Sequence, residues 1–302
     1  MIAILSAPTN LGLKPPVPGG VPGASKAPEA FRDAGLYDRL INVGARDAGV
    51  VLPGRYVDDD ATRASQHLRN EQAIVNHSRR LAHRIKAIQH QGGTPLVLGG
   101  DCSLLVGVGL ALASDTPPGL IHVDGHTDFR HPANSSECAS LAGEDLAAVV
   151  GLHWPAVADI DSLGPYFPPA RTVHIGCRTN DEDVDEASAT LALVVPAGAA
   201  IRQGIPTAAA TAAAAAGGTY WLHIDVDVLD PQWMPAVDSP DPGGLDPAQL
   251  LTLLTALAPG AIGASVSIFD PDLDPDARHA ALLVDLLTTG VQKLGTATVD
   301  AE

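Results

Sequence analysis

The sequence predicts a three-layer αβα fold built on a mostly parallel central sheet. Short runs of apolar residues recur along the 302-residue chain, and helix-type patterns lie between them. Strands that are apolar throughout and alternate with helices are typical of a parallel sheet covered on both faces. Because 46% of the residues are hydrophobic and no linker interrupts the alternation, we expect one domain over residues 1–302 with a large core.

The predicted strands are the apolar runs themselves. They lie at residues 2–6 (IAILS), 94–101 (TPLVLGGD), 119–126 (GLIHVDGH), 171–178 (RTVHIGCR), 191–195 (LALVV), 219–227 (TYWLHIDVD) and 262–270 (IGASVSIFD). The Gly/Pro-rich stretch 10–23 follows the first run and predicts an irregular surface loop.

Helices are predicted between these strands. Residues 59–90 space their apolar side chains at three and four, as an amphipathic helix does, and Gly92-Gly93 ends the pattern. Further helices are expected at residues 103–113, at the Ala-rich stretch 207–216, and after Asp246, an N-cap residue that precedes Pro247.

Charge and cysteine content exclude several classes of partner. Asp and Glu number 35 against 18 Lys and Arg, so the net charge of −17 would repel a nucleic-acid backbone. No segment combines a basic face with an apolar one, which argues against binding an anionic membrane. Cys102, Cys138 and Cys177 are too few for a disulfide framework, and no targeting or membrane-spanning segment is recognised, so we expect a cytoplasmic location.

Carboxylates follow the predicted strands and are the most informative feature of the sequence. The run HVDGHTDF places Asp124, His126 and Asp128 two apart, and HIDVDVLDP places Asp225 and Asp227 two apart. On an extended backbone, residues two apart point to the same side, so each set is expected to converge. The carboxyl ends of parallel strands are also where ligands bind in α/β folds.

A metal centre accounts for this cluster better than helix capping does. A lone Asp after a strand is more often an N-cap than a ligand. Asp225 and Asp227, however, sit in a run of Trp, Leu, Ile and Val, where two like charges would repel strongly without a cation. With Cys102 after a neighbouring strand, the ligands exceed the needs of one ion, so two metal ions are expected.

The chain resembles the arginase/agmatinase/formiminoglutamase family of ureohydrolases. The resemblance rests on LGGDCS at 98–103, HVDGHTDF at 122–129 and HIDVDVLDP at 223–231, where the family has roughly GGDHS, DAHxD and SxDxDxxDP. It extends to residues 23–36, 176–178 and 235–245. It implies an arginase-like fold, a small guanidino-type substrate and a homo-oligomer, trimeric or hexameric.

The resemblance also implies a ligand set and a reaction. Two divalent ions, manganese by analogy, would share a bridging hydroxide that attacks a guanidinium carbon and releases urea or a substituted urea and an amine. Asp124 and Asp225 would bridge the ions, Cys102 and Asp128 would complete the first site, and His126 and Asp227 would complete the second. Asp128 would also hold the hydroxide by a hydrogen bond.

Cys102 departs from the family, which has a histidine ligand at this position. A thiolate is softer than imidazole and suits Zn²⁺ or Fe²⁺ better than Mn²⁺. Its position at a predicted helix N-terminus would favour the thiolate form. The alternative is that Cys102 is a small buried residue and the first site is incomplete. Some relatives that resemble this chain at the Cys motif act on N-hydroxylated arginine, so an N-hydroxyguanidino substrate is an open option.

Proton delivery and substrate recognition also depart from the family. Ala142 stands where arginases have a proton-shuttling histidine, and His131 and His153 are nearby in sequence but equally compatible with structural roles. The strand at 262–270 has Ser265 or Ile268, depending on alignment, where the family has a glutamate for the guanidinium, with Asp270 nearby.

Two further positions bear on the amino-acid end of a substrate. Arg130 falls where arginases place an asparagine, and it would pair with a substrate carboxylate or remain a solvated loop residue. Asp181 falls near a position that binds the α-amino group.

Two functions remain open from the sequence. The first is a binuclear metal-dependent amidinohydrolase. The second is an arginase-like metal-binding protein that lacks hydrolase activity. Retention of Asp124, His126, Asp128, Asp225 and Asp227 together favours the enzyme.

Overall fold

A computed structural model describes residues 1–297 and contains one eight-stranded sheet whose paired strands are all parallel. The strand order is β2-β1-β3-β8-β7-β4-β5-β6. The strands are β1 (Ile2–Ala7), β2 (Arg46–Val50), β3 (Thr94–Gly99), β4 (Gly119–Val123), β5 (Thr172–Ile175), β6 (Leu193–Val195), β7 (Tyr220–Asp225) and β8 (Ala261–Ser267). The predicted αβα fold class is confirmed.

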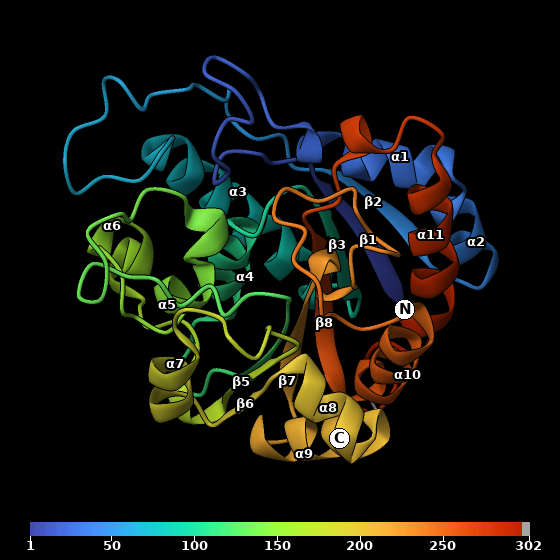
Figure 1. Ribbon diagram of the computed structural model, residues 1–302. Coiled ribbons are helices and arrows are strands. Elements are labelled where there is room, and N and C mark those ends of the chain that lie inside the picture. Colours follow the sequence, from blue (N-terminus) through green and yellow to red (C-terminus); the bar gives the residue numbers. More distant parts are fainter. Residues whose placement is uncertain (298–302) are drawn as a thin grey trace.

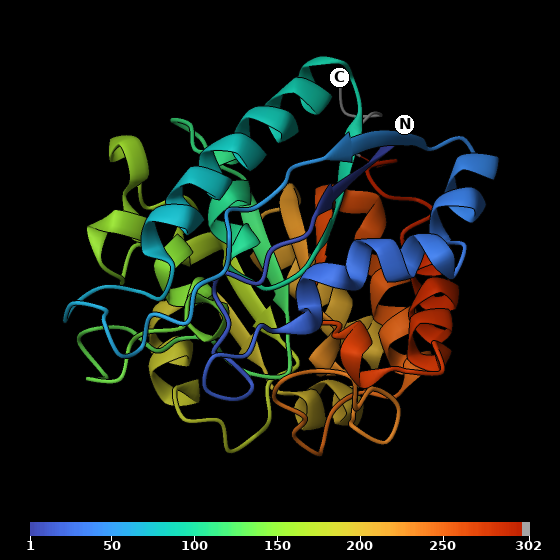
Figure 2. The ribbon, with the colours of Figure 1, turned by 90° about the horizontal axis from the view of Figure 1, so that it is seen from above.

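Helices cover both faces of this sheet (Figures 1 and 2). One layer contains α3 (Glu71–His90), α4 (Leu104–Leu112), α5 (Asp145–Val149) and α6 (Pro155–Ala158). The other contains α1 (Ala27–Asp33), α2 (Leu36–Asn42), α8 (Ala197–Gln203), α9 (Ile205–Ala215), α10 (Pro247–Leu257) and α11 (Arg278–Gly290). Helix α7 (Val184–Thr190) packs beside β6. Short 3-10 helices lie at Gly23–Lys26, Leu141–Gly143, Ile160–Ser162, Pro169–Arg171, Val226–Val228, Ala258–Gly260 and Pro271–Leu273.

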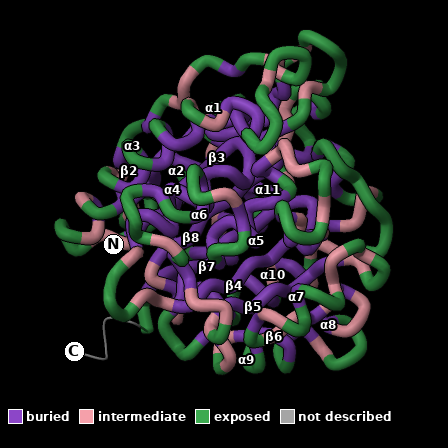
Figure 3. The backbone as a smooth tube through the Cα atoms, turned by 90° about the vertical axis from the view of Figure 1, so that its left-hand side faces the viewer, coloured by how far each residue is buried: buried purple, intermediate pink, exposed green. Residues whose placement is uncertain are grey.

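The apolar strands divide their side chains between two cores. In β3, Leu96 and Leu98 join the core beneath α1, α10 and α11, whereas Val97 joins the core beneath α3 and α4. Because successive side chains of a strand point to opposite faces, a strand between two helical layers must be apolar at every position. The sheet and the inner helix faces are accordingly buried, and exposed backbone is concentrated in peripheral loops (Figure 3).

Two expectations about elements were wrong. The helix predicted over 59–90 begins only at Glu71, because residues 59–70 form turns in which Asp59 accepts from Asn70 N (3.0 Å) and binds Arg63 (2.9 Å). Side chains that bond nearby backbone groups compete with helix formation. Strand β2 was missed because it lies at the sheet edge with only one buried residue, Ala48, and therefore has no apolar run.

The sheet order brings the candidate ligands together. Strands β3, β8, β7 and β4 are successive neighbours, so the segments that follow β3, β4 and β7 meet at the same edge of the sheet. Strands β4 and β7 end at Val123 and Asp225, earlier than the sequence predicted, so most candidate ligands lie just beyond the strands. Within residues 1–297, no helix has the length and apolar character needed to cross a bilayer.

Candidate metal centre

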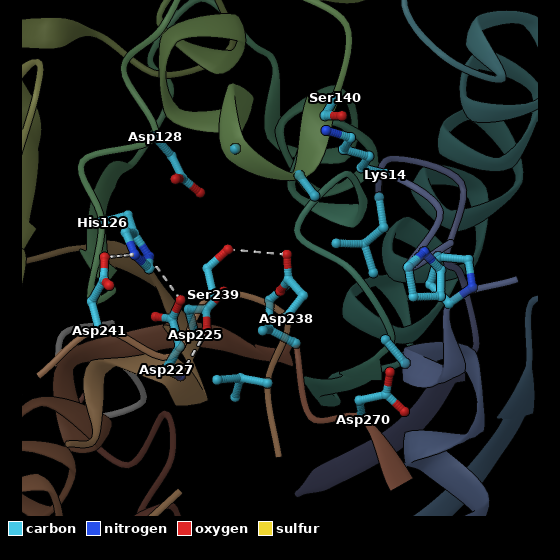
Figure 4. A pocket seen from close by; sticks show the side chains of 18 of the residues that line it. Lys14, His126, Asp128, Ser140, Asp225, Asp227, Asp238, Ser239, Asp241 and Asp270 are labelled. Atoms are coloured by element: carbon cyan, nitrogen blue, oxygen red, sulfur yellow. Dashed lines mark hydrogen bonds and ion pairs between the residues drawn. The ribbon is translucent and has the colours of Figure 1, made fainter. Parts of the chain in front are cut away.

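A pocket of about 760 Å³ opens at the carboxyl ends of the strands (Figure 4). Acidic side chains dominate the part shown around His126 in Figure 4. The lining includes His126, Asp128, Asp225, Asp227, Asp238, Asp241 and Asp270, and Lys14 and Arg130 contribute basic side chains. This is the site that the carboxylate motifs predict.

Tight turns after β4 and β7 fix the two carboxylate motifs. The carboxylate of Asp124 accepts from His126 N (2.7 Å), and that of Asp225 accepts from Asp227 N (2.8 Å). Asp227 in turn accepts from Gly125 N (2.9 Å), which joins the two motifs. A Cβ atom at Gly125 would lie 2.6 Å from the Asp227 carbonyl oxygen, so only glycine permits this approach.

The predicted convergence is therefore found, but it does not arise from extended backbone as expected. The strands do not continue through these residues: Asp227 lies in the 3-10 turn Val226–Val228, and Asp128 has a positive φ of 48°. Short polar side chains such as Asp tolerate this left-handed conformation better than bulky ones. The side chains meet because Asp-mediated turns fold back on the strand ends.

Two groups of ligand atoms result, and Asp124 belongs to both. The first contains Cys102, Asp124 and Asp225, and the second contains Asp124, His126 and Asp227, with the atoms of each group within 4.8 Å of one another. Asp128 lies beside them and forms a third group with His122 and Asp145, two residues that the sequence motifs did not single out. A shared carboxylate between two groups is the arrangement that a pair of neighbouring ions requires.

The electrostatics of the site fit cations. Burial raises the pKa values of Asp124, Asp128 and Asp225 well above the usual range, and neighbouring carboxylates raise them further. The Oδ2 atom of Asp124 is buried and has no hydrogen-bond partner among the described residues. Buried carboxylates that lack donors are stabilised by bound metal ions, so the residues present fit the divalent ions that the motifs imply.

His126 and Asp227 form an ion pair in the second group. The His126 Nδ1 atom lies 2.8 Å from Asp227 Oδ2, and its Nε2 atom lies 3.3 Å from Asp241 Oδ2. Burial lowers the pKa of His126, but the hydrogen bond and charge of Asp227 outweigh it and raise the pKa to about 10. The same pair holds the pKa of Asp227 below its usual range despite burial. An incoming cation must displace the imidazole proton.

Cys102 is fully buried beneath the pocket. Its thiol donates to Asp225 Oδ2 (2.8 Å) and lies 3.0 Å from Ser267 Oγ. Burial and the charge of Asp225 raise the pKa of this thiol well above its ordinary value. The expectation that its position favours the thiolate was therefore wrong for the metal-free chain. Desolvation and the nearby carboxylates raise the pKa of the thiol more than the helix N-terminus lowers it. A cation would be needed to deprotonate it.

The two predicted substrate-binding residues are both at the pocket wall. Asp181 accepts from Thr127 N (3.2 Å) and from the Thr127 hydroxyl, so it holds the loop that carries His126 and Asp128. The guanidinium of Arg130 donates to the exposed Glu182 (3.2 Å) at the rim. Arg130 thus faces the pocket, and its present partner is a surface carboxylate.

The two histidines near Ala142 in sequence lie outside the pocket lining. Ala142 itself lines the pocket. His131 binds Glu186 (3.0 Å) and accepts from Ala133 N, and the buried His153 binds Glu144 (2.9 Å). Neither ring belongs to the lining of the described pocket.

The structure identifies a carboxylate that the sequence motifs did not single out. Ser265 is buried and bonded to Trp221 and His223, whereas Ile268 lines the pocket without a polar group. Asp238 projects into the same space, and its carboxylate accepts a long hydrogen bond from the Ser239 hydroxyl (3.4 Å) (Figure 4). The residue is exposed at the pocket, where desolvation by the surrounding walls and the charge of Asp227 raise its pKa to about 6.

Asp270 was already named from the sequence, and Asp238 could have been noticed there. Asp238 lies in PAVDSPDPGGL, one of the segments that carry the family resemblance. Asp270 also lines the pocket, but its carboxylate accepts from Gly23 N (3.1 Å) and Asp272 N (2.9 Å), so it is occupied in joining two loops. Of these two carboxylates, that of Asp238 is less engaged in hydrogen bonds to nearby loops.

Comparisons with known proteins identify the family of the chain. Residues 2–290 match the model of the arginase family. The chain is 28% identical to an arginase of Bacillus caldovelox over 295 residues, covering 95% of this chain and 96% of that one. It is 28% identical to an N(omega)-hydroxy-L-arginine amidinohydrolase of Streptomyces lavendulae over 237 residues, covering 78% and 80%. A native structure of the Bacillus caldovelox arginase superposes with a TM-score of 0.85 at 27% identity, covering 96% and 97%. The chain belongs to the arginase family.

Proposed function

We propose that this chain is a binuclear metal-dependent amidinohydrolase that acts on a guanidino or N-hydroxyguanidino compound and releases urea or hydroxyurea and an amine. The observation that carries the proposal is the pair of ligand groups that share Asp124, of which His126, Asp225 and Asp227 line an acidic pocket. The arginases and the N-hydroxyarginine amidinohydrolase to which the chain is similar support this reaction class.

In this proposal Cys102, Asp124, Asp128, His126, Asp225 and Asp227 hold the ions. Mn²⁺ is the expected metal by family membership, with Zn²⁺ or Fe²⁺ as alternatives because of the Cys102 sulfur. Bound together, two divalent ions lower the pKa of water so that a nucleophile is available near neutral pH. The family membership and the hard carboxylate ligands both favour Mn²⁺.

Two carboxylates would act on the substrate directly. Asp128 is half-buried at the pocket wall, and its raised pKa suits a group that accepts a proton during attack and releases it later. Asp238 faces the same space and would pair with the guanidinium, in place of the glutamate that the β8 strand lacks. Arg130 and Asp181 line the same pocket and would bind the other end of the substrate.

The absence of a histidine at position 142 bears on the choice of substrate. A positioned general acid is worth about 10²–10⁴-fold in rate. Since Ala142 cannot donate and His131 and His153 are held elsewhere, Asp128 would have to return the proton to the leaving amine. An N-hydroxyguanidino compound stands beside arginine in the proposal because one relative is an N(omega)-hydroxy-L-arginine amidinohydrolase.

A substrate panel tests this proposal. Metal-stripped protein is reloaded with Mn²⁺, Zn²⁺ or Fe²⁺ and assayed with arginine, N-hydroxyarginine and agmatine for release of urea or hydroxyurea. Asp128→Asn is the control, and we expect it to lower kcat by at least about 10²-fold. Two bound ions with no turnover of any guanidino compound would instead support the metal-binding protein without hydrolase activity.

We also propose a cytoplasmic homo-oligomer, a trimer or a hexamer. The free thiols of Cys102, Cys138 and Cys177 and the family membership support this assignment. Light scattering coupled to gel filtration measures the mass of the assembly. A monomer at micromolar concentration would refute the oligomeric part of the proposal.

A further inference from the structure

The pocket has an apolar wall away from the candidate metal ligands. In Figure 4, Lys14 and Asp270 lie on one side of the pocket and His126 and Asp128 on the other, with Asp238 between them. Most of the apolar lining comes from the loop that carries Lys14. We call the following lining residues the apolar wall: Leu13, Pro15, Pro16, Val21, Pro22 and Leu273. The proposed reaction gives this wall no role.

Two side chains of the apolar wall are largely exposed to solvent. Val21 keeps 58% of its surface accessible, and Leu273 keeps 51%. Single exposed apolar side chains are common on protein surfaces, but several that line one pocket are typical of a ligand site. A ligand that covers Val21 and Leu273 gains affinity because it removes apolar surface from water.

The loop of the apolar wall is held in place before any ligand binds. The carbonyl oxygen of Leu13 accepts from the Tyr56 hydroxyl (3.1 Å), and the side-chain amide of Asn10 donates to the carbonyl oxygen of Pro22 (2.9 Å). The loop over residues 10–23 also contains four prolines, each of which fixes φ. A wall that is already formed costs little conformational entropy when a ligand covers it.

The segment that carries Leu273 is joined to the same loop. Asp272 precedes Leu273 and forms an ion pair with Lys26 (2.5 Å). The carboxylate of Asp270 accepts from Gly23 N (3.1 Å). A Cβ atom at Gly23 would collide with Asp270 and Asp272, so the two segments meet at a distance that only glycine permits. The loop and the segment after β8 therefore form one surface.

The size of the pocket leaves room for a ligand along this wall. Its volume of about 760 Å³ lies within the range of about 300–1,000 Å³ that holds drug-sized ligands. In the proposed function, Asp238 and the metal ligands take the guanidinium end of the substrate. The space beside Val21 and Leu273 is then left for the part of the substrate that the guanidinium carries.

We propose that the substrate is an alkyl- or arylguanidine with an extended apolar body, and that the apolar wall selects it. The inference rests on the proposed function, because the wall and the candidate metal ligands line one pocket. The guanidinium lies at Asp238, and the apolar body covers Val21 and Leu273. A short guanidino compound reaches the metal ligands but leaves both side chains in water, so it binds more weakly.

Binding of amines tests the wall separately from the reaction. Protein loaded with Mn²⁺ is titrated calorimetrically with n-butylamine, n-hexylamine and n-octylamine, the amines that hydrolysis of the corresponding n-alkylguanidines would release. Urea release from those guanidines is measured in parallel.

Val21→Ser and Leu273→Ser remove apolar surface from the wall. Val17→Ser is the matched control, because Val17 is in the same loop and is 62% exposed but is outside the pocket lining. Circular dichroism verifies that each variant folds.

We expect wild type to bind n-octylamine at least about tenfold more tightly than n-butylamine, since complete burial would add about fourfold for each CH₂ group. Val21→Ser and Leu273→Ser should each lower this affinity ratio at least about threefold, and Val17→Ser should leave it within about 1.5-fold. The kcat/KM values of the n-alkylguanidines should follow the same order.

Equal affinity for the three amines, or no binding of any of them, would overturn the proposal even if urea is released. A ratio that both Val21→Ser and Leu273→Ser leave unchanged, or that Val17→Ser lowers equally, would also overturn it. If one wall variant fails to fold, the other decides. The expected ratios without urea release from any guanidine would reject the proposed reaction and leave the apolar wall as a binding surface.

Discussion

Raising the pH from 7 to 9 should destabilise the metal-free chain, and divalent metal should reverse the effect. Burial and neighbouring carboxylates raise the pKa values of Asp124 and Asp225, so the folded chain keeps protons that the unfolded chain releases above about pH 4. The folded state binds more protons than the unfolded state, and its stability therefore falls as the pH rises.

His126 contributes in the same direction and sets the magnitude. Its pKa of about 10 in the fold exceeds the unfolded value of about 6.5, so the stability gained from protonation is complete below pH 6.5 and is lost as the pH rises through 10. Between pH 7 and 9 this linkage amounts to about 2 kcal/mol. With an unfolding entropy of about 2.1 cal/mol/K per residue, a chain of this length would lose about 3 °C of melting temperature.

Metal binding should oppose this loss. Ligands bind metal in their deprotonated form, so affinity for Mn²⁺ rises with pH. Each ion at 100 times its Kd adds about 2.7 kcal/mol, or about 4 °C. Calorimetric melting of chelator-treated and Mn²⁺-loaded protein at pH 7, 8 and 9 measures both effects, and His126→Asn should flatten the metal-free slope. A metal-free melting temperature that rises from pH 7 to 9, or one that Mn²⁺ does not change, would refute the reasoning.

Four substitutions test individual residues. Asp238→Asn should lower kcat/KM for a guanidino substrate by about 10–100-fold, mainly through KM, because a charge-assisted hydrogen bond is worth about 1.5–3 kcal/mol. An unchanged KM would show that Asp238 does not bind the guanidinium. Cys102→His should raise the affinity for Mn²⁺ relative to Zn²⁺ in competition dialysis, since imidazole is harder than thiolate, and an unchanged ratio would show that the sulfur is no ligand. His131→Gln and His153→Gln should leave the pH profile of kcat unaltered, because their rings bind Glu186 and Glu144 away from the pocket; loss of one limb of the profile would identify the missing proton donor.

Local sequence was sufficient for most of the fold and for naming most of the candidate ligands. Continuous apolar runs predicted each strand except β2, because a strand buried on both faces must be apolar at every position, whereas an edge strand need not be. The motifs around Asp124 and Asp225 named the candidate ligands, since carboxylates buried side by side repel one another strongly unless a cation lies between them.

Only the tertiary structure could show how these groups are placed. Turns rather than extended strands bring Asp225 and Asp227 together, and the Asp59 and Arg63 contacts delay the start of α3. Cys102 is a buried thiol that donates to Asp225, which raises the pKa of the thiol. Its position before a helix, read from the sequence, had predicted the thiolate form instead.

The sequence by itself determined the fold class, the family and the principal candidate ligands, because each depends on residue types at short spacing. The tertiary structure alone decided which distant residues share a point in space. His122 and Asp145 are 23 positions apart and carry no common motif, yet the sheet order and the packing of α5 bring them to 3.7 Å. Such proximity comes from long-range packing, which local residue patterns do not encode.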